Sequence, residues 1–289
     1  MIIWSRWSRA SPEGPEIHAQ AVRLQFLKGE RPRLFSPYLP ALEELQGKRV
    51  KEVGAQGKAF LIHFEGGRSL YAHMQLYGRW MFGKPGQEPK TNRQLRLSLS
   101  TAEQEARLYS ATDIEILTAA GLKKHPYLSR LGPDLLDPGT KQSDLFERLR
   151  DKKFSGRRLA ALLLDQTFWA GPGNYLRSEI LFCAGLTPEM RPRDLDENQA
   201  RRLVEAAQGL ARRSLKTKGI TTPPDLVTKA KKAGQTRRWY RHWVFNRLGR
   251  PCWVCETPIR KEEWGGRRLY RCLDCQGGGT WEMNFADLE

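Results

Sequence analysis

The chain has 289 residues, of which 39% are hydrophobic, and it carries a formal net charge of +17 at pH 7. This length is sufficient for two domains that each bury a core, and the absence of any run of about 18 apolar residues argues against a transmembrane helix. A charge this positive indicates a polyanionic partner, above all nucleic acid.

The first structured element that the sequence predicts is a helix from Glu16 to Gly29. Pro15 precedes it, as proline often does at a helix start, and apolar residues recur on or near one face: Ile17, Ala21, Leu24, Phe26 and Leu27. Residues 1–11 contain no acidic side chain and no apolar stretch long enough for a signal peptide. We interpret them as an unstructured leader or as the result of a translation start placed too early.

Short strands separated by Gly-rich or polar turns are predicted next, at residues 59–64, 69–73, 94–100 and 106–110. Strands of this length and spacing are typical of a β-sandwich or a related two-sheet domain. A Gly- and Pro-containing stretch beginning at Leu131 then marks a linker.

After the linker the hydrophobic period becomes helical, and helices are predicted at residues 144–150, 159–168, 175–184 and 198–214. The break Ala170-Gly171-Pro172-Gly173-Asn174 offers backbone N–H groups at the start of the third helix. It fits either an ordinary interhelix turn or, in this basic chain, a turn that grips phosphate.

The positive charge is concentrated between Arg212 and Arg250. This segment contains twelve Lys or Arg residues against a single acid, Asp225, and aromatic residues are interleaved with them: Trp239, Tyr240, Trp243 and Phe245. Such a run is usually a solvated charged face. Because it leads directly into a cysteine motif, we favour a surface that follows the phosphates of a nucleic acid.

Two C-x2-C knuckles with 16 residues between them comprise Cys252, Cys255, Cys272 and Cys275. Four thiolates at this spacing are typical of a closed structural zinc ribbon, with a hairpin turn at Gly265-Gly266 between the knuckles. The alternative is two disulfides or four unrelated thiols. We predict one structural Zn²⁺ and a reducing, cytoplasmic location. The fifth cysteine, Cys183, lies in an apolar run and is predicted to be a buried structural thiol.

Several motifs, taken in order, resemble the Fpg/Nei family of DNA glycosylases. The resemblance runs from Pro12 to Gln276 and is carried by Pro12-Glu13-Gly14-Pro15-Glu16-Ile17, Gln56-Gly57-Lys58-Ala59, Gln75-Leu76-Tyr77-Gly78, Tyr109-Ser110-Ala111-Thr112-Asp113-Ile114-Glu115, Gly132-Pro133-Asp134, Leu163-Leu164-Asp165-Gln166, Gly173-Asn174-Tyr175-Leu176-Arg177 and Cys275-Gln276. The third motif is more similar to the endonuclease VIII branch than to the formamidopyrimidine branch.

The resemblance implies an α+β multidomain fold: an N-terminal helix plus β-sandwich, a helix–two-turns–helix domain and a C-terminal zinc ribbon. In this chain it implies a catalytic β-sandwich domain at 12–130, a linker at 131–143 and a helix–two-turns–helix DNA-binding domain at 144–235. A zinc finger at 236–276 and a tail at 277–289 complete the predicted organisation.

The resemblance also implies a chemistry, that of a base-excision-repair DNA glycosylase with abasic-site (AP) lyase activity on oxidised pyrimidines. In the family the initiating Met is removed, and the secondary amine of the proline attacks C1′ of the damaged nucleotide. The base leaves, a Schiff base forms, and β- and δ-elimination cut the strand. A free α-amine titrates at about 8, so a useful share is unprotonated near pH 7.

Roles carry over by position. The resemblance implies that Pro12 is the nucleophile, Glu13 the acid that helps to open the sugar and expel the base, and Lys58 the proton donor for β-elimination. Arg267 resembles the zinc-finger arginine that grips the phosphates at the lesion and aids δ-elimination. Without the family, Glu13 reads as a carboxylate at a helix N-terminus and Lys58 as a surface cation in a turn. For Arg267 the alternative is a hairpin charge, which its position at the turn disfavours.

Five further residues are implied in DNA binding: Gln75, Leu76, Tyr77, Arg130 and Asn174. The first three resemble the wedge that fills the gap when a base flips out, although by themselves Leu76 and Tyr77 would more often be core residues. Arg130 and Asn174 resemble phosphate ligands. The expected partner is double-stranded DNA with a damaged base or an abasic site, bound by a monomer in a bacterial cytoplasm, at the nucleoid and not at a membrane.

Two positions depart from the family pattern. Pro172 stands where an aliphatic residue is usual, and it removes one backbone N–H. Pro12 follows Ser11 in this sequence, so its nitrogen is an amide and cannot form a Schiff base while the preceding residues are attached. A catalytically silent damaged-DNA-binding protein is therefore the alternative function. A generic zinc-ribbon RNA binder would explain the charge and the cysteines but not the segment from Pro12 to Lys58.

Overall fold

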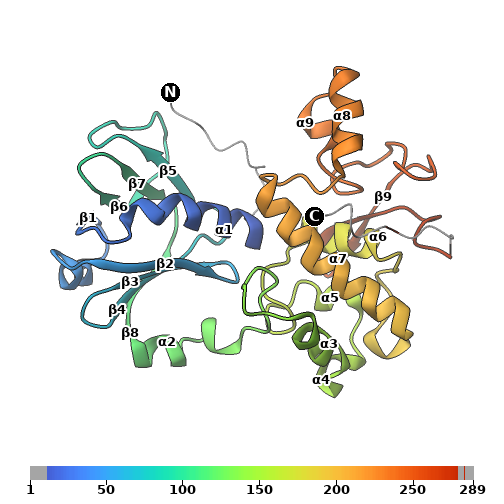
Figure 1. The fold of residues 1–289 in the computed structure, drawn as a ribbon, viewed down its shortest axis with the longest axis horizontal. Helices are drawn as coiled ribbons and strands as arrows, with labels where there is room; N and C mark the ends of the chain where they lie inside the picture. The colour runs from blue at the N-terminus through green and yellow to red at the C-terminus, as the bar shows by residue number, and fades with distance from the viewer. Residues whose placement is uncertain (1–11, 279–282, 284–289) are drawn as a thin grey trace. The chain divides into compact units, whose positions relative to one another are not determined.

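The computed structural model describes residues 12–278 and 283. The predicted leader and most of the predicted tail lie outside the described residues. The chain divides into two compact units, one made of Pro12 and Glu16–Arg130, the other of Glu13–Pro15 and the chain from Leu131 onward (Figure 1). Within the described ranges, no helix is both long enough and apolar enough to cross a membrane.

The first unit contains two four-stranded antiparallel sheets. One has the strand order β1-β6-β7-β5 and the other β2-β3-β4-β8. The strands are β1 (Arg33–Phe35), β2 (Val50–Gln56), β3 (Ala59–Phe64), β4 (Arg68–His73), β5 (Arg79–Gly83), β6 (Leu95–Ser100), β7 (Glu105–Tyr109) and β8 (Asp113–Thr118). The four predicted strands coincide with β3, β4, β6 and β7 to within a residue, whereas β1, β2, β5 and β8 are additional.

The two sheets share one apolar core, so the predicted β-sandwich is confirmed. Phe60 of β3 and Trp80 of β5 meet edge to face with ring centroids 5.8 Å apart. Helix α1 (Gly14–Arg23) contributes Ile17 and Ala21 to the same core and continues as the 3-10 turn η1 (Leu24–Leu27). The helical segment therefore begins two residues before the predicted Glu16 and ends before Gly29. The unit is completed by η2 (Pro40–Leu45), α2 (Ala119–Lys124) and η3 (Leu128–Arg130).

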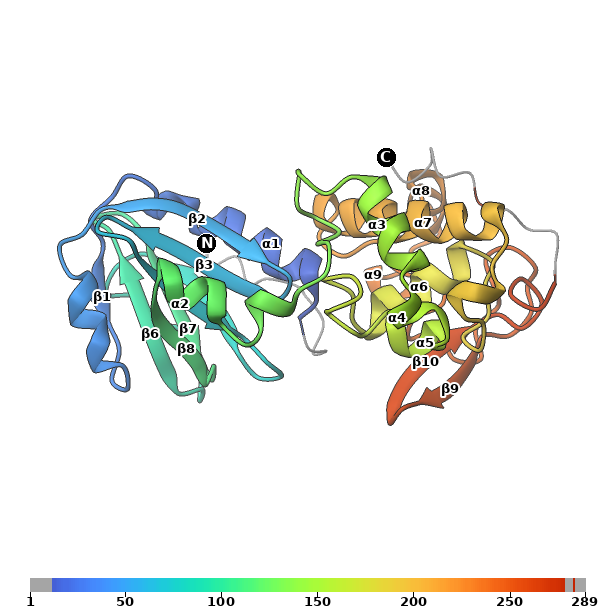
Figure 2. The same ribbon diagram turned by 90° about the horizontal axis from the view of Figure 1, so that it is seen from below.

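The second unit is helical and ends in a β-hairpin. Its elements are α3 (Gln142–Arg150), α4 (Lys152–Ser155), α5 (Leu159–Leu162), α6 (Asn174–Cys183), η4 (Pro192–Asp194), α7 (Glu197–Lys216), α8 (Pro224–Lys232), α9 (Arg237–Tyr240), β9 (Arg260–Trp264) and β10 (Arg267–Arg271). Helix α6 packs against both α7 and β10, and its side chains from Tyr175 to Cys183 are all buried. This burial makes α6 the central element of the unit (Figure 2).

The predicted helix at 159–168 is wrong in its extent, since α5 ends at Leu162. The cause is Asp165, whose carboxylate accepts hydrogen bonds from both the backbone N–H (2.9 Å) and the hydroxyl (2.7 Å) of Thr167. Such local side-chain contacts compete with helical hydrogen bonds. The chain from Leu163 to Gly173 consequently runs through turns, and Gly171 adopts a positive φ of 110°.

Candidate functional site

The site in the second unit is built around the N-terminus of α6. The first turn of a helix has N–H groups without helical partners, and here Glu13 supplies the acceptors. Its carboxylate accepts hydrogen bonds from the N–H groups of Gly173 (2.8 Å), Tyr175 (2.7 Å) and Leu176 (3.1 Å). Glu13 is only 3% exposed, and a negative charge is favourable at this end of a helix.

Two glycines allow this close approach. A Cβ on Gly173 would lie 2.5 Å from the carboxyl carbon of Glu13, and one on Gly14 would lie 2.9 Å from Cα of Gly171. The N–H of Gly14 also donates to the carbonyl of Gly171 at 2.9 Å. Since Pro12 is covalently joined to Glu13, it is attached directly to this fixed segment. The alternative interpretation of Glu13 was a carboxylate at a helix N-terminus, and its contacts agree with this. The helix is α6, however, and not α1, which follows Glu13 directly in the chain.

Arg177 connects this helix start to the β9–β10 hairpin. Its guanidinium donates to the carbonyl of Arg268 at 3.1 Å, to that of Arg267 at 3.4 Å and to Oδ1 of Asn174 at 3.4 Å. Burial lowers the pKa of Arg177 to about 10, with Glu13 raising and Arg267 lowering it. One buried cation therefore holds two of the predicted site residues, Asn174 and Arg267, on neighbouring elements, while the side chain of Arg267 is exposed.

A second buried charge of α6 anchors the segment that leads into the cysteine motif. The carboxylate of Glu179 accepts hydrogen bonds from the N–H groups of Trp243 (2.8 Å), Val244 (2.9 Å) and Phe245 (2.9 Å), and from the hydroxyl of Thr221. Burial raises the pKa of Glu179, and these hydrogen bonds oppose the rise.

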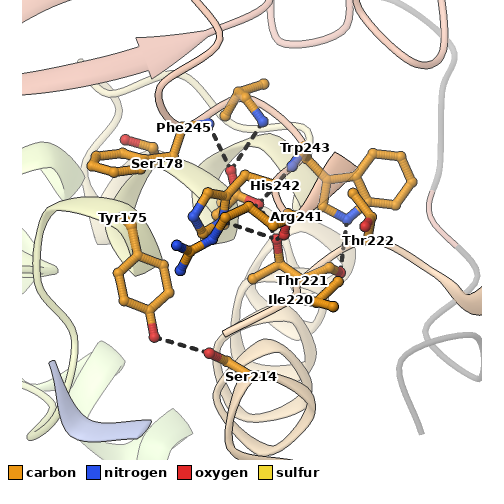
Figure 3. A network of polar contacts seen from close by, with 12 residues as sticks. Tyr175, Ser178, Ser214, Ile220, Thr221, Thr222, Arg241, His242, Trp243 and Phe245 are labelled. Carbon is orange, nitrogen blue, oxygen red and sulfur yellow. Dashed lines mark hydrogen bonds and ion pairs between the residues drawn. The ribbon is translucent and has the colours of Figure 1, made fainter. Parts of the chain in front are cut away.

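Aromatic rings enclose this network (Figure 3). His242 packs between Tyr175 and Phe245, with ring centroids 5.4 and 5.5 Å away, and the hydroxyl of Tyr175 lies 3.0 Å from that of Ser214 on α7. Burial, with the neighbouring charge of Arg241, lowers the pKa of His242 well below its usual value. Sequence reasoning missed Glu179 and assigned no role to Arg177; the signal available was a pair of opposite charges inside an otherwise apolar helix.

The four predicted metal ligands come together. The sulfur atoms of Cys252, Cys255, Cys272 and Cys275 all lie within 4.8 Å of one another. The closest pairs are 3.3, 3.5 and 3.8 Å apart, far longer than an S–S bond of about 2.05 Å, so the disulfide alternative is wrong. A tetrahedral ion with metal–sulfur bonds of about 2.3 Å places its sulfurs about 3.8 Å apart.

The surrounding chain fits a zinc ribbon. Strands β9 and β10 pair antiparallel between the two knuckles, and Gly265 and Gly266 turn with φ of 58° and 70°. Gln276 joins the second knuckle to the helical part, because its side chain accepts from the N–H of Cys272 and donates to the carbonyl of Leu186. Cys183 is a buried free thiol in α6, as predicted.

In the first unit, the predicted wedge is exposed at the turn between β4 and β5. Leu76 and Tyr77 are 63% and 71% exposed, so the alternative of core residues is wrong. The turn itself is fixed, because Gln75 has a positive φ of 49° and donates its N–H to Nδ1 of His73 at 3.0 Å. The side chain of Gln75 also accepts from the hydroxyl of Thr112 at 3.0 Å.

Lys58 occupies the turn between β2 and β3, where its N–H donates to the hydroxyl of Tyr127 at 2.9 Å. His73 lies near it: burial and the charge of Lys58 lower the pKa of His73, against the opposing effect of Asp113. His73 therefore lies between Lys58, whose charge acts on it, and Gln75, whose N–H it accepts. The sequence did not predict this link. Arg130 ends η3, and its Nε donates to the carbonyl of Pro126 at 2.7 Å.

The chain resembles known proteins along nearly all of its length. Residues 11–113 match the N-terminal domain of formamidopyrimidine-DNA glycosylase, and residues 131–224 match the helix–two-turns–helix domain of that enzyme. Endonuclease 8 of Escherichia coli is 42% identical over 270 residues, which are 92% of this chain and 99% of the relative. Endonuclease 8 of Klebsiella pneumoniae is 41% identical over the same length.

Solved structures share the fold. The MutM (Fpg) protein of Thermus thermophilus superposes with a TM-score of 0.72 at 28% identity, covering 93% of this chain and 100% of that one. Lactococcus lactis Fpg, in a complex with DNA that contains N7-benzyl-Fapy-dG, superposes with a TM-score of 0.74 at 20% identity, covering 92% and 99%.

Proposed function

Because this chain belongs to the formamidopyrimidine-DNA glycosylase family, with endonuclease 8 proteins as near full-length relatives, we propose that it is a base-excision-repair DNA glycosylase with AP lyase activity. Its substrates are oxidised pyrimidines in duplex DNA, and abasic sites. It acts as a monomer on the nucleoid in a bacterial cytoplasm.

The observation that carries this proposal is that Glu13, the residue directly after Pro12, has a carboxylate that is held in a fixed position. A nucleophile reacts fastest when the group that assists it is held in the correct position. The three N–H groups of the α6 turn hold Glu13. In the proposed reaction the free secondary amine of Pro12 forms a bond to C1′ as the base leaves with the electrons of the bond that joined it to C1′. The proton that the amine loses passes by way of Glu13 to the ring oxygen, so the sugar opens and the nitrogen becomes an iminium.

The elimination steps then depend on positively charged groups. The iminium formed on Pro12 is an electron sink that acidifies the adjacent C–H of the sugar. Lys58 would be the proton donor for β-elimination, and Arg267 would grip the phosphates and aid δ-elimination. The exposed side chain of Arg267, on a hairpin whose backbone Arg177 binds, supports this role because a phosphate can reach it.

The remaining residues would bind the DNA. Gln75, Leu76 and Tyr77 would fill the gap left by the everted nucleotide, which their exposure on a fixed turn supports. Asn174 and Arg130 would bind phosphates. We also propose that the four cysteines hold one structural Zn²⁺, since a site with four protein thiolates is closed to further ligands.

The test compares two proteins on a duplex with one oxidised pyrimidine: the full chain, verified intact by mass, and a version that begins at Pro12. The trimmed version should cleave the strand and be trapped on DNA by borohydride, whereas the full chain should bind without a trapped adduct. In the trimmed version, Glu13→Gln should slow base removal about a hundredfold and slow cleavage of a preformed abasic site less. The exposed Glu147→Gln on α3 serves as its control.

Two results would overturn the assignment. If the intact full chain is trapped as efficiently as the trimmed one, Pro12 is not the nucleophile and a lysine must be, with Lys58 the first to test. If neither version cleaves or is trapped while both bind damaged DNA, the chain is the catalytically silent binding protein.

A further inference from the structure

A groove lies between α8, α9 and the first cysteine knuckle, and it contains none of the residues that have a role in the proposed function. It encloses about 400 Å³, a volume within the range of small-ligand sites. Its lining residues are Asp225, Leu226, Lys229, Ala230, Ala233, Gln235, Trp239 and Trp253. None of them belongs to the α6 turn or to the β9–β10 hairpin, and Figure 2 shows α8 and that hairpin at opposite edges of the second unit.

Two indole rings give the groove its aromatic character. An arginine packs against one face of each ring: the guanidinium of Arg250 lies 4.3 Å from the centroid of Trp239, and that of Arg247 lies 3.9 Å from the centroid of Trp253. Arg247 is 1% exposed and donates to the carbonyls of Trp239 (3.0 Å) and Pro251 (2.6 Å). One buried cation therefore joins α9 to the knuckle, and the indole N–H of Trp253 donates to the carbonyl of His242 at 3.2 Å, so this ring is held before any ligand arrives.

The polar lining offers both donors and acceptors. Lys229 provides an ammonium group, Gln235 an amide and Asp225 a carboxylate, and all three are exposed. The flanking helices add Lys231, Lys232 and Arg238, which are also exposed. The groove therefore combines stacking surfaces, groups that can pair with the edge of a base, and surrounding positive charge.

We propose that this groove is a second nucleic-acid site, which takes an unpaired base of single-stranded DNA. Stacking on aromatic side chains within a basic surface is how proteins hold single strands without reading a sequence. Asp225 can accept a hydrogen bond from an exocyclic amino group, and Lys229 can bind the neighbouring phosphate. A duplex does not fit, since its bases are stacked within the helix. An acidic peptide lacks the flat ring that stacks on the indole groups.

The test uses the intact chain and a short single-stranded oligonucleotide that carries 5-iodouracil, a base that crosslinks to stacked aromatic rings under ultraviolet light. Mass spectrometry of the crosslinked peptides should identify the peptide with Trp239 or that with Trp253. An excess of duplex with an abasic-site analogue occupies the proposed glycosylase site, and the crosslink should persist in its presence. This arm separates the groove from the site around Glu13.

Variants then test the contacts by fluorescence anisotropy with the same strand. Trp239→Leu should weaken binding roughly tenfold, whereas Trp239→Phe should retain most of it, because stacking on one aromatic ring contributes about that factor. Lys229→Glu should weaken binding more than Lys232→Glu, which makes the same change of charge on the same helix outside the lining.

Three outcomes would overturn the proposal. One is a crosslink confined to other parts of the chain, together with unchanged binding by Trp239→Leu. Another is tighter Trp239-dependent binding of a ribo-oligonucleotide of the same sequence, which would assign the groove to RNA. The third is Trp239-dependent binding of a glutamate-rich peptide without binding of the strand, which would make it a peptide site.

Discussion

Two buried carboxylates, Glu13 and Glu179, each accept three backbone N–H groups from a segment distant in the sequence. Buried N–H groups without acceptors are costly, at about 1–3 kcal/mol each. Each carboxylate therefore fixes a whole segment: Glu13 joins its own residues to the α6 turn, and Glu179 joins residues 243–245 to α6. At this scale the site depends on two acids that each hold a segment in place, and a chemical role is proposed only for Glu13.

His242 gives a prediction for pH. In the unfolded chain its imidazole gains a proton as the pH falls through about 6.5, but burial and Arg241 lower its pKa well below that in the folded chain. The unfolded state then binds more protons. The contribution of His242 is thus present above about pH 6.5, and the free energy of unfolding should fall by about 1.4 kcal/mol per pH unit below it.

The measurement is thermal or denaturant unfolding of the second unit between pH 7.5 and 5.5, with zinc present throughout. Glu179 acts in the opposite sense, because burial raises its pKa, so the informative quantity is the difference between the parent and His242→Phe. The variant keeps an aromatic ring and should have a shallower decline towards acid. Identical pH profiles for the two proteins would mean that His242 does not titrate on unfolding.

Helix α6 and the turn before it form the element on which the proposed site depends. A substitution of Gly173, which lies in that turn, tests this dependence. A Cβ there would meet the carboxyl group of Glu13, which three hydrogen bonds prevent from moving freely. Gly173→Ala should therefore displace Glu13, destabilise the fold by about 1–3 kcal/mol and abolish most of the strand cleavage by the Pro12-initiated protein. Gly156→Ala is the control, since the nearest atom to its Cβ is 4.0 Å away. Equal cleavage by both variants would contradict the role given to the turn.

The cysteine module gives the second prediction for an element. Metal binding to a four-thiolate ribbon contributes on the order of 10 kcal/mol to local folding, so Cys272→Ser should lose the ion, unfold the β9–β10 hairpin and weaken DNA binding through Arg267. Cys183→Ala, which removes a buried thiol outside the cluster, should keep one zinc per chain in elemental analysis. A folded, active preparation without zinc would disprove the structural role of the metal.

Helices and strands could be predicted where their own residues show a clear hydrophobic pattern that ends in recognisable turns. Strands β3, β4, β6 and β7 are apolar runs between clear turns and could be predicted, whereas β1 has only three residues with one buried side chain. The helix at 159–168 was predicted too long because the carboxylate of Asp165 ends it through a contact that hydrophobic periodicity does not report.

The site residues likewise fall into those that the sequence predicts and those that it does not. Spacing alone predicted the cysteine cluster, because four ligands of one ion must recur at short intervals. Roles for Pro12, Glu13 and Lys58 came only from the family resemblance, since a carboxylate or a lysine in a turn is ordinary. The burial of Arg177 and Glu179 was missed, because a charge on a helix is normally on its exposed face, and the apolar residues around this pair were the only signal against that expectation.

For the whole molecule, the distribution of charge limits how DNA can be bound. Of the twelve cations between Arg212 and Arg250, three are buried and bind backbone carbonyls: Arg213 that of Thr222, Arg241 that of Gly219, and Arg247 those of Trp239 and Pro251. These three hold the fold and cannot also bind phosphate. The predicted phosphate-following surface is therefore smaller than the sequence suggested, and exposed cations elsewhere, Arg267 among them, are the candidates for further phosphate contacts.

The salt dependence of DNA binding measures this surface. If about five or six phosphates are contacted, the logarithm of the binding constant should fall with the logarithm of salt concentration at a slope of about −5. Arg267→Ala should make that slope shallower by about 0.9, because it removes one phosphate contact. Arg150→Ala should leave the slope unchanged, since Arg150 is paired with Glu197 at 2.6 Å on the helical surface. Titration of a labelled abasic-site duplex over a range of salt concentrations gives all three slopes. A slope near zero for the parent would mean that binding does not rest on the basic surface, and an unchanged slope for Arg267→Ala would remove this arginine from the phosphate contacts.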